Sequence, residues 1–318
     1  MDGLYELLNR DVAVTDNGRD GFFDMHNGYL APGFWTGYVA RARSRNLSLQ
    51  DLAVPRDILG YAKTIAIERA LGRPDTYHNE RIHAGANYSP LVLLESREQT
   101  DAATGEINQC IRGLFGEEQY AEFVSSICEL VGDLLDNVWA HGKATGFSMA
   151  QKWRDPPDGF RFEFSVADCG MGFLRELQRV GMNITDDRAA IEWCIQRGHS
   201  TKKREVDEWE QRLPSDVMGN PMGRFGRVVE SDNHHMGLGL AKLITAVELF
   251  HGRCWLASGN AMLCITPDGQ RNFVNLPIPW KGVAIACRFD SQRIAAPKEQ
   301  YTGDEFEDIL SKLMRAES

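Results

Sequence analysis

The sequence has few cysteines, no long apolar run and no excess of basic residues. It contains 318 residues, and none of its 7 cysteines is spaced as a C-x-x-C pair. An odd number of cysteines without such pairs is typical of a reduced, cytoplasmic chain rather than a disulfide framework. No apolar stretch reaches about 18 residues, so we expect no membrane-spanning helix. The charged N-terminus lacks the apolar centre of a secretory signal.

Basic residues number 35 against 45 acidic ones, which gives a formal net charge of −10. This balance argues against a general nucleic-acid-binding protein, which needs a basic surface. Apolar residues form 43% and charged residues 25% of the chain, which suits a globular protein with a core. The length allows about two or three domains. The 30 glycines, beside only 12 prolines, mark either turns or a backbone that binds phosphate.

Two common phosphate-binding motifs are also missing. The pattern G-x-x-x-x-G-K-[ST] occurs nowhere in the sequence. Gly237 and Gly239 do not form a dinucleotide-binding fingerprint, because they follow a polar segment rather than a strand and no third glycine stands at position 242. Internal repeats and low-complexity segments are absent as well.

Residues 1–115 contain short helical and strand-like segments but no chemical motif. The composition of Tyr61–Ala70 predicts a helix that stops before Gly72. The apolar run Ser89–Leu94 predicts a strand, and Ala102–Phe115 predicts a second helix. We therefore treat this part of the chain as a smaller α/β region of unknown role.

The segment 117–141 predicts an amphipathic helix with a polar stripe opposite its apolar face. Apolar residues recur at steps of three and four from Phe123 to Val138. The stripe consists of Glu129, Asp133, Asn137 and His141. Because these residues are four apart, neighbours lie about 5–6 Å from each other on one helix face. A carboxylate and a carboxamide on adjacent turns suit Mg²⁺ and an activated water, although a solvated polar face has the same pattern.

Two glycine motifs follow this helix. Phe160–Ala167 alternates apolar and polar residues, which predicts a strand, and the D-x-G-x-G motif of Asp168, Gly170 and Gly172 comes directly after it. An aspartate there can accept a hydrogen bond from an exocyclic amine, and glycine lets a flat ring approach the backbone. Residues 237–240, G-L-G-L, open a predicted helix whose backbone N–H groups suit a phosphate. Taken singly, each motif is also typical of an ordinary turn.

The order of the three motifs resembles the GHKL, or Bergerat-fold, ATPases, the relatives of gyrase, MutL and the histidine kinases. The matching residues are Asp133, Asn137, His141 and Gly142 in the N box, Asp168, Gly170 and Gly172 in the G1 box, and Gly237, Leu238, Gly239 and Leu240 in the G2 box. The resemblance implies an α+β fold with a Bergerat-type α/β sandwich, in which helices cover a mixed, mostly antiparallel sheet. It implies an ATP-binding domain at 116–290, followed by a C-terminal helix and tail at 291–318.

The resemblance also implies ATP and Mg²⁺ as cofactors and a role for each matched residue. Asn137 would be the Mg²⁺ ligand, and Asp133 would be the catalytic acid that polarises the attacking water. Asp168 would bind the adenine amino group, and a lid at about 174–236 would close over the phosphates. The residues implied to contact the nucleotide are Asn137, His141, Asp168, Gly170, Gly172, Ser200, Thr201, Lys202, Gly237, Leu238, Gly239 and Leu240.

Two positions depart from the family pattern. Asp133 stands where many hydrolysing members have glutamate, and its shorter side chain sets the carboxylate back, which would slow water activation. Relatives carry a Gly-Thr pair on a late strand, with the threonine near adenine. The nearest match in this chain is Gly282 followed by Val283, so the hydroxyl is absent or supplied elsewhere.

Three functions stay open at this point. The first is ATP hydrolysis, or an ATP-dependent switch acting on an unidentified protein partner, with a homodimer expected from family analogy. The second is a protein kinase of the anti-sigma or two-component type. The third is a nucleotide-binding scaffold with low turnover, which Asp133 favours. The short stretch after Phe289 leads us to expect no transducer domain.

Overall fold

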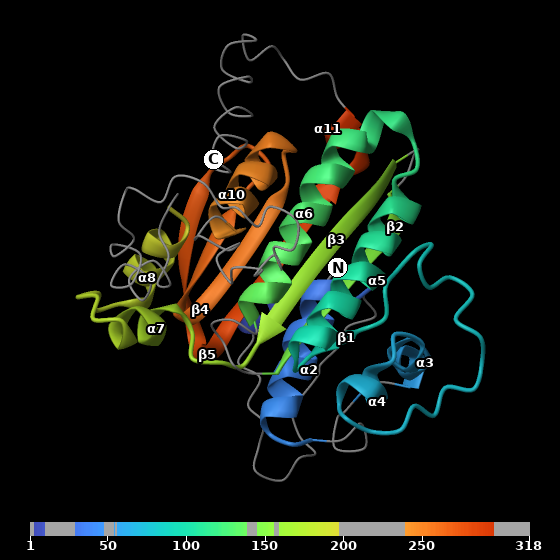
Figure 1. Ribbon diagram of the computed structural model, residues 1–318, viewed down its shortest axis with the longest axis horizontal. Coiled ribbons are helices and arrows are strands. Elements are labelled where there is room, and N and C mark those ends of the chain that lie inside the picture. Colours follow the sequence, from blue (N-terminus) through green and yellow to red (C-terminus); the bar gives the residue numbers. More distant parts are fainter. Residues whose placement is uncertain are drawn as a thin grey trace, which may run out of the picture.

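A computed structural model describes residues 3–9, 29–47, 54, 56–138, 145–155, 159–196 and 239–295. A five-stranded sheet forms its centre, in the order β1-β2-β3-β5-β4 (Figure 1). The strands are β1 Val92–Leu94, β2 Gly146–Asp155, β3 Gly159–Asp168, β4 Arg253–Ile265 and β5 Arg271–Asp290. The longer helices are α2 Pro32–Ser44, α3 Arg56–Thr64, α5 Arg97–Leu114, α6 Ala121–Asn137, α8 Asp187–Cys194 and α10 Gly239–Leu249. The shorter ones are α1 Leu4–Asn9, α4 Ile67–Ala70, η2 Glu118–Tyr120, α7 Phe173–Arg179 and α11 Ser291–Ala295.

Every pair of neighbouring strands in this sheet is antiparallel, whereas we expected a mixed sheet that is mostly antiparallel. β2 and β3 pair over their whole length, with Gly146 opposite Asp168 at the end of β3. β5 pairs with β3 on one side and with β4 on the other, and the register with β4 shifts on both sides of Gly259. The α+β class is confirmed.

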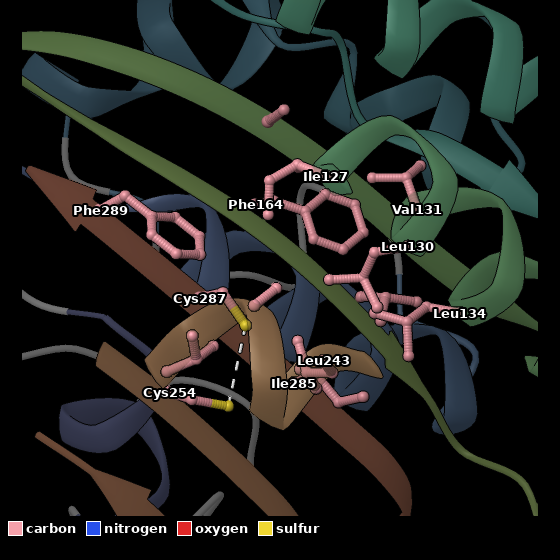
Figure 2. Packing of buried hydrophobic residues seen from close by; sticks show 14 of the residues in the cluster. Ile127, Leu130, Val131, Leu134, Phe164, Leu243, Cys254, Ile285, Cys287 and Phe289 are labelled. Atoms are coloured by element: carbon pink, nitrogen blue, oxygen red, sulfur yellow. Dashed lines mark hydrogen bonds between the residues drawn. The ribbon is translucent and has the colours of Figure 1, made fainter. Parts of the chain in front are cut away.

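Helices α5, α6 and α10 cover one face of the sheet (Figure 1). Figure 2 shows Leu130 and Leu134 of α6 and Leu243 of α10 gathered with Phe164 and Ile285 of the sheet. The apolar spacing of α6 produces this core, because side chains three and four residues apart project toward the same face. The predicted helix at 117–141 is confirmed through Asn137, and its last residues lie outside the described ones.

The opposite face of the sheet carries α1 and α2, which form a second core. Phe34, Trp35 and Tyr38 of α2 are fully buried, and Ala42 on the last turn is buried as well. A helix buried on all sides has no polar stripe, so periodicity did not predict it. We call α1 and α2 the N-terminal layer.

The expected boundary at residue 115 does not separate the described elements. β1 pairs with β2 as an edge strand of the sheet, and α5 packs beside α6 in the same core. Ser96 begins α5 by accepting a hydrogen bond from the backbone N–H of Gln99, which sets the helix start earlier than Ala102. β1 and α5 therefore belong to the same packed unit as α6 and the rest of the sheet.

Several predicted elements differ in their limits. The helix expected at Tyr61–Ala70 is divided into α3 and α4, because Ala66 adopts a left-handed conformation with φ of 63°. The apolar runs Cys254–Ala257 and Ala261–Ile265, each of which the sequence predicts as a separate strand, form one strand, β4, with irregular pairing around Gly259. The predicted C-terminal helix within 291–318 lies beyond the described residues, apart from α11.

All seven cysteines are free thiols, as expected. Cys254 and Cys287 lie opposite each other on β4 and β5, with their sulfur atoms 3.7 Å apart (Figure 2). Burial raises the pKa of Cys287 well above its usual value, and the neighbouring thiol adds to the effect. These thiols behave as small apolar groups of the core. Within the described ranges, no helix combines the length and the apolar character needed to cross a bilayer.

Candidate functional site

The end of α6 and the beginning of α10 meet at Asp133, Asn137 and Gly239. A Cβ atom placed on Gly239 would lie 3.2 Å from Nδ2 of Asn137 and 3.2 Å from Cβ of Asp133. Glycine therefore lets the first turn of α10 approach the polar stripe of α6 closely. The four-residue spacing predicted that Asp133 and Asn137 share one helix face, and the approach of Gly239 shows which element faces them.

The same end of α6 also reaches the end of β3. A Cβ atom on Gly146 would lie 2.5 Å from Cγ1 of Val138 and 3.5 Å from the carbonyl oxygen of Ala167. Gly146 is the strand partner of Asp168, so Val138, directly after Asn137, packs next to the D-x-G-x-G turn. The described residues of the three sequence motifs thus converge at one end of the sheet.

Asp168 is a buried carboxylate, with 6% of its surface exposed. Its Oδ1 atom accepts a hydrogen bond of 2.7 Å from the backbone N–H of Gly170. Burial raises the pKa of Asp168 to about 6, although hydrogen bonds from the backbone of Gly170 and Val283 oppose the increase. The group is therefore an acceptor held in a low-dielectric environment, whose charge changes just below neutral pH.

Gly282 on β5 packs directly against this turn. A Cβ atom there would lie 2.4 Å from the carbonyl oxygen of Asp168 and 2.7 Å from the amide nitrogen of Gly170, and its φ of 102° also requires glycine. Ser258 on β4 donates a hydrogen bond to the carbonyl of Gly282 at 3.0 Å and accepts one from the N–H of Phe173 at 3.1 Å. Gly282, which together with Val283 is the nearest match to the family's Gly-Thr pair, therefore lies next to Asp168.

Lys242 is a site residue that the sequence reasoning missed. Its ammonium nitrogen lies 3.2 Å from Oδ2 of Asp133 and also pairs with Glu129. Lys242 stands three residues after Gly239, so it lies on the same face of α10 one turn further along. That spacing after the glycine could have drawn attention to it.

The N-terminal layer touches the back of the Asp168 turn, a contact that no motif indicated. Trp280 donates from its indole N–H to the carbonyl oxygen of Asp168 at 3.2 Å. The guanidinium of Arg41 on α2 lies over the Trp280 ring, 5.5 Å from its centroid. The thiol of Cys169 donates to the carbonyl of Ala40 at 3.1 Å.

The structure describes only some of the residues predicted to contact nucleotide. Asp133, Asn137, Asp168, Gly170, Gly172, Gly239 and Leu240 lie within it. His141, Gly142, Ser200, Thr201, Lys202, Gly237 and Leu238 lie outside the described residues. The beginning of the predicted lid forms α7 and α8, and Asp187 at the start of α8 accepts a hydrogen bond of 2.8 Å from the N–H of Asn260 on β4.

Asn137 carries an amide oxygen, a hard and neutral donor of the kind that Mg²⁺ accepts as a ligand. In the part of the chain that the structure describes, no three His, Cys, Asp or Glu side chains gather as a metal site. A magnesium ion at Asn137 would take its other ligands from phosphate and water, which is the usual coordination of Mg²⁺ with nucleotides. The close approach of Gly239 leaves backbone, rather than a side chain, beside Asn137.

Comparisons of the chain with protein-family models, with curated proteins and with solved structures give no match. The resemblance carried by the three motifs therefore stays a prediction.

Proposed function

We propose that this protein binds ATP with Mg²⁺, and that the bound nucleotide is hydrolysed or acts as a conformational switch on a protein partner. The observation that carries the proposal is the meeting of the end of α6 with the start of α10 at Asn137 and Gly239, beside the Asp168 turn. This meeting supports the proposal, because residues far apart in the sequence lie together there and carry the kinds of groups that would bind a nucleotide.

Asp168 would recognise the base. Its carboxylate is a buried acceptor whose environment is fixed by Gly170 and Gly282, and an exocyclic amino group is the donor that such an acceptor suits. The turn is built from glycines, so a flat ring can approach its backbone. These features support adenine as the base.

Asp133 and Asn137 would act at the phosphates. Bound Mg²⁺ supplies positive charge that neutralises phosphate oxygens. Asn137 would hold this ion through its amide oxygen, and Asp133 would accept a proton from a water molecule. Backbone N–H groups at the start of α10, beginning at Gly239, would donate to phosphate oxygens.

Purified protein incubated with Mg²⁺ and ATP labelled at the γ-phosphate tests the proposal. Free labelled phosphate supports hydrolysis, whereas bound but unchanged ATP supports the switch. Label transferred to protein would favour the kinase instead. A chain that binds no ATP at all would overturn the proposal.

Asn137→Ala tests the metal-ligand role. We expect the affinity for MgATP to fall by at least about tenfold, because the ion loses a protein ligand. Isothermal titration with and without Mg²⁺ measures the effect, which should be small without the ion. The matched control is Asp136→Asn on the same helix, since residue 136 lies about 100° away from residue 137. Equal affinities for Asn137→Ala and the wild type would contradict the role.

A further inference from the structure

A cluster of three charges joins α6 to α10 beside the candidate site. The ammonium of Lys242 lies 3.2 Å from Oδ2 of Asp133 and donates a hydrogen bond to Oε1 of Glu129. Glu129 and Asp133 stand on successive turns of α6. Lys242 therefore bridges two carboxylates of one helix from the neighbouring helix.

The three members of the cluster differ in their access to water. The side chains of Asp133 and Lys242 are 18% and 25% exposed, whereas that of Glu129 is 60% exposed. Burial alone lowers the pKa of Lys242, but the hydrogen bond to Glu129 and the charges of both carboxylates raise it above its usual value. Lys242 is thus a cation at neutral pH and cannot serve as a proton acceptor.

The position of Asp133 creates an electrostatic problem for an anionic ligand. Its carboxylate is on the helix face that Gly239 approaches, and a polyphosphate bound there would be repelled by a second negative charge. Because the surroundings are partly buried, water screens this repulsion less than at a free surface. The ammonium of Lys242 reduces the charge of the cluster, since one cation offsets one of the two carboxylates, and it leaves the Asp133 carboxylate in place.

We propose that Lys242 is a positioning residue that neutralises and orients Asp133, so that a nucleoside triphosphate can bind beside it. The inference rests on the proposed function. Glu129 contacts the ammonium from the more exposed side, and Asp133 is its more buried partner. The ion pair also orients the carboxylate of Asp133, whose side chain is one methylene shorter than that of a glutamate.

Binding of the magnesium complex of a non-hydrolysable ATP analogue, measured by isothermal titration, tests this charge compensation without turnover. Lys242→Met should lower the affinity about five- to tenfold, because Asp133 and Glu129 keep their charges while the ammonium that offsets one of them is lost. The double variant Asp133→Asn with Lys242→Met should return to within about twofold of the wild type, since neither charge remains. Lys242→Arg keeps the cation and should also bind within about threefold.

Controls separate the possible causes of a change. Lys63→Met removes a lysine on α3 that contacts Thr76 and Glu68, and it should bind as the wild type does. Thermal unfolding of each variant shows that it is folded. If the double variant binds as weakly as Lys242→Met, or if Lys242→Met has no effect, the inference is wrong. If the wild type does not bind the analogue, the proposed function itself fails.

Discussion

The two faces of the sheet differ in how deeply their charged side chains are buried. Beneath the N-terminal layer, Glu163 on β3 is fully buried, and both of its oxygens have partners. One accepts from the N–H of Gly33 at 2.7 Å, and the other accepts from Nε of Arg288 at 2.6 Å. On the other face, Asp133 and Lys242 lie partly exposed at the edge of the core. A satisfied buried charge fixes the elements around it, whereas a partly exposed pair can exchange partners with a ligand.

This contrast gives the N-terminal layer a structural role in the sheet. Gly33 lies in the first turn of α2, so Glu163 holds the start of that helix against the strand. The guanidinium of Arg288 lies between two indole rings, 5.5 Å from the centroid of Trp153 and 5.2 Å from that of Trp255. We expect loss of these contacts to affect folding, and loss of the contacts around Asp133 to affect binding.

The largest effect is expected for Glu163→Ala. This change leaves the Arg288 guanidinium and the Gly33 N–H without their partner in a buried place, which should lower the free energy of unfolding by about 3–5 kcal/mol. Urea unfolding followed by circular dichroism measures the loss. The matched control is Glu192→Ala, which removes a carboxylate from the exposed ion pair with Arg188 and should cost less than about 1 kcal/mol. If both variants lose a similar free energy of unfolding, the buried position of Glu163 gives it no special role in stability.

The second prediction concerns Asp168, where binding and stability should change in opposite directions. Asp168→Asn loses an anionic acceptor, so the affinity for ATP should fall about ten- to a hundredfold. The free energy of unfolding at neutral pH should stay the same or increase, because a buried charge is removed. Titration and urea unfolding of the same samples measure both quantities. A parallel loss of stability and affinity would mean that Asp168 serves mainly to hold its turn.

The pH dependence of stability, compared between the wild type and Asp168→Asn, gives a second test of the role of Asp168. Since the pKa of Asp168 is about 6 in the native state, the folded chain keeps this proton to a higher pH than the unfolded chain does. The stability that the group contributes is complete below about pH 4 and is lost as the pH rises to about 6, a change of about 3 kcal/mol. The stability of the wild type relative to Asp168→Asn should therefore fall between about pH 4 and pH 6 and stay nearly constant above that range.

Apolar residues at every second position predicted strands, and apolar residues at every third or fourth position predicted helices. Both patterns arise in elements that bury only one face. The helix of Asp133 and the strand that ends at Asp168 follow from such patterns, and so does the shared face of Asp133 and Asn137. The same reasoning missed α2, which is buried around most of its surface and so shows no clear polar face, and the first half of β5, where Pro277 and Pro279 interrupt the strand pattern.

Contacts between distant segments escaped prediction for a different reason. The pairing of Lys242 with Asp133, and the packing of Gly282 against Asp168, depend on which helices and strands become neighbours. No local pattern encodes that choice, because it is set by packing over the whole sheet. The sequence alone indicated which chemical groups form the candidate site. Which residues contact those groups became clear only from the folded structure.

The smallest predicted effect concerns the contact between the N-terminal layer and the Asp168 turn. Arg41 of α2 covers the ring of Trp280, and that indole donates to the carbonyl of Asp168, so the N-terminal layer supports the turn that would bind adenine. Arg41→Met should weaken ATP binding about two- to fivefold, since a cation over an aromatic ring contributes about 0.5–1 kcal/mol and the change reaches Asp168 indirectly. The matched control is Arg81→Met, which removes a guanidinium over the ring of Tyr77, 4.9 Å from the ring centroid. If both variants bind ATP equally, the contact through Trp280 is structural only, and the two faces act independently.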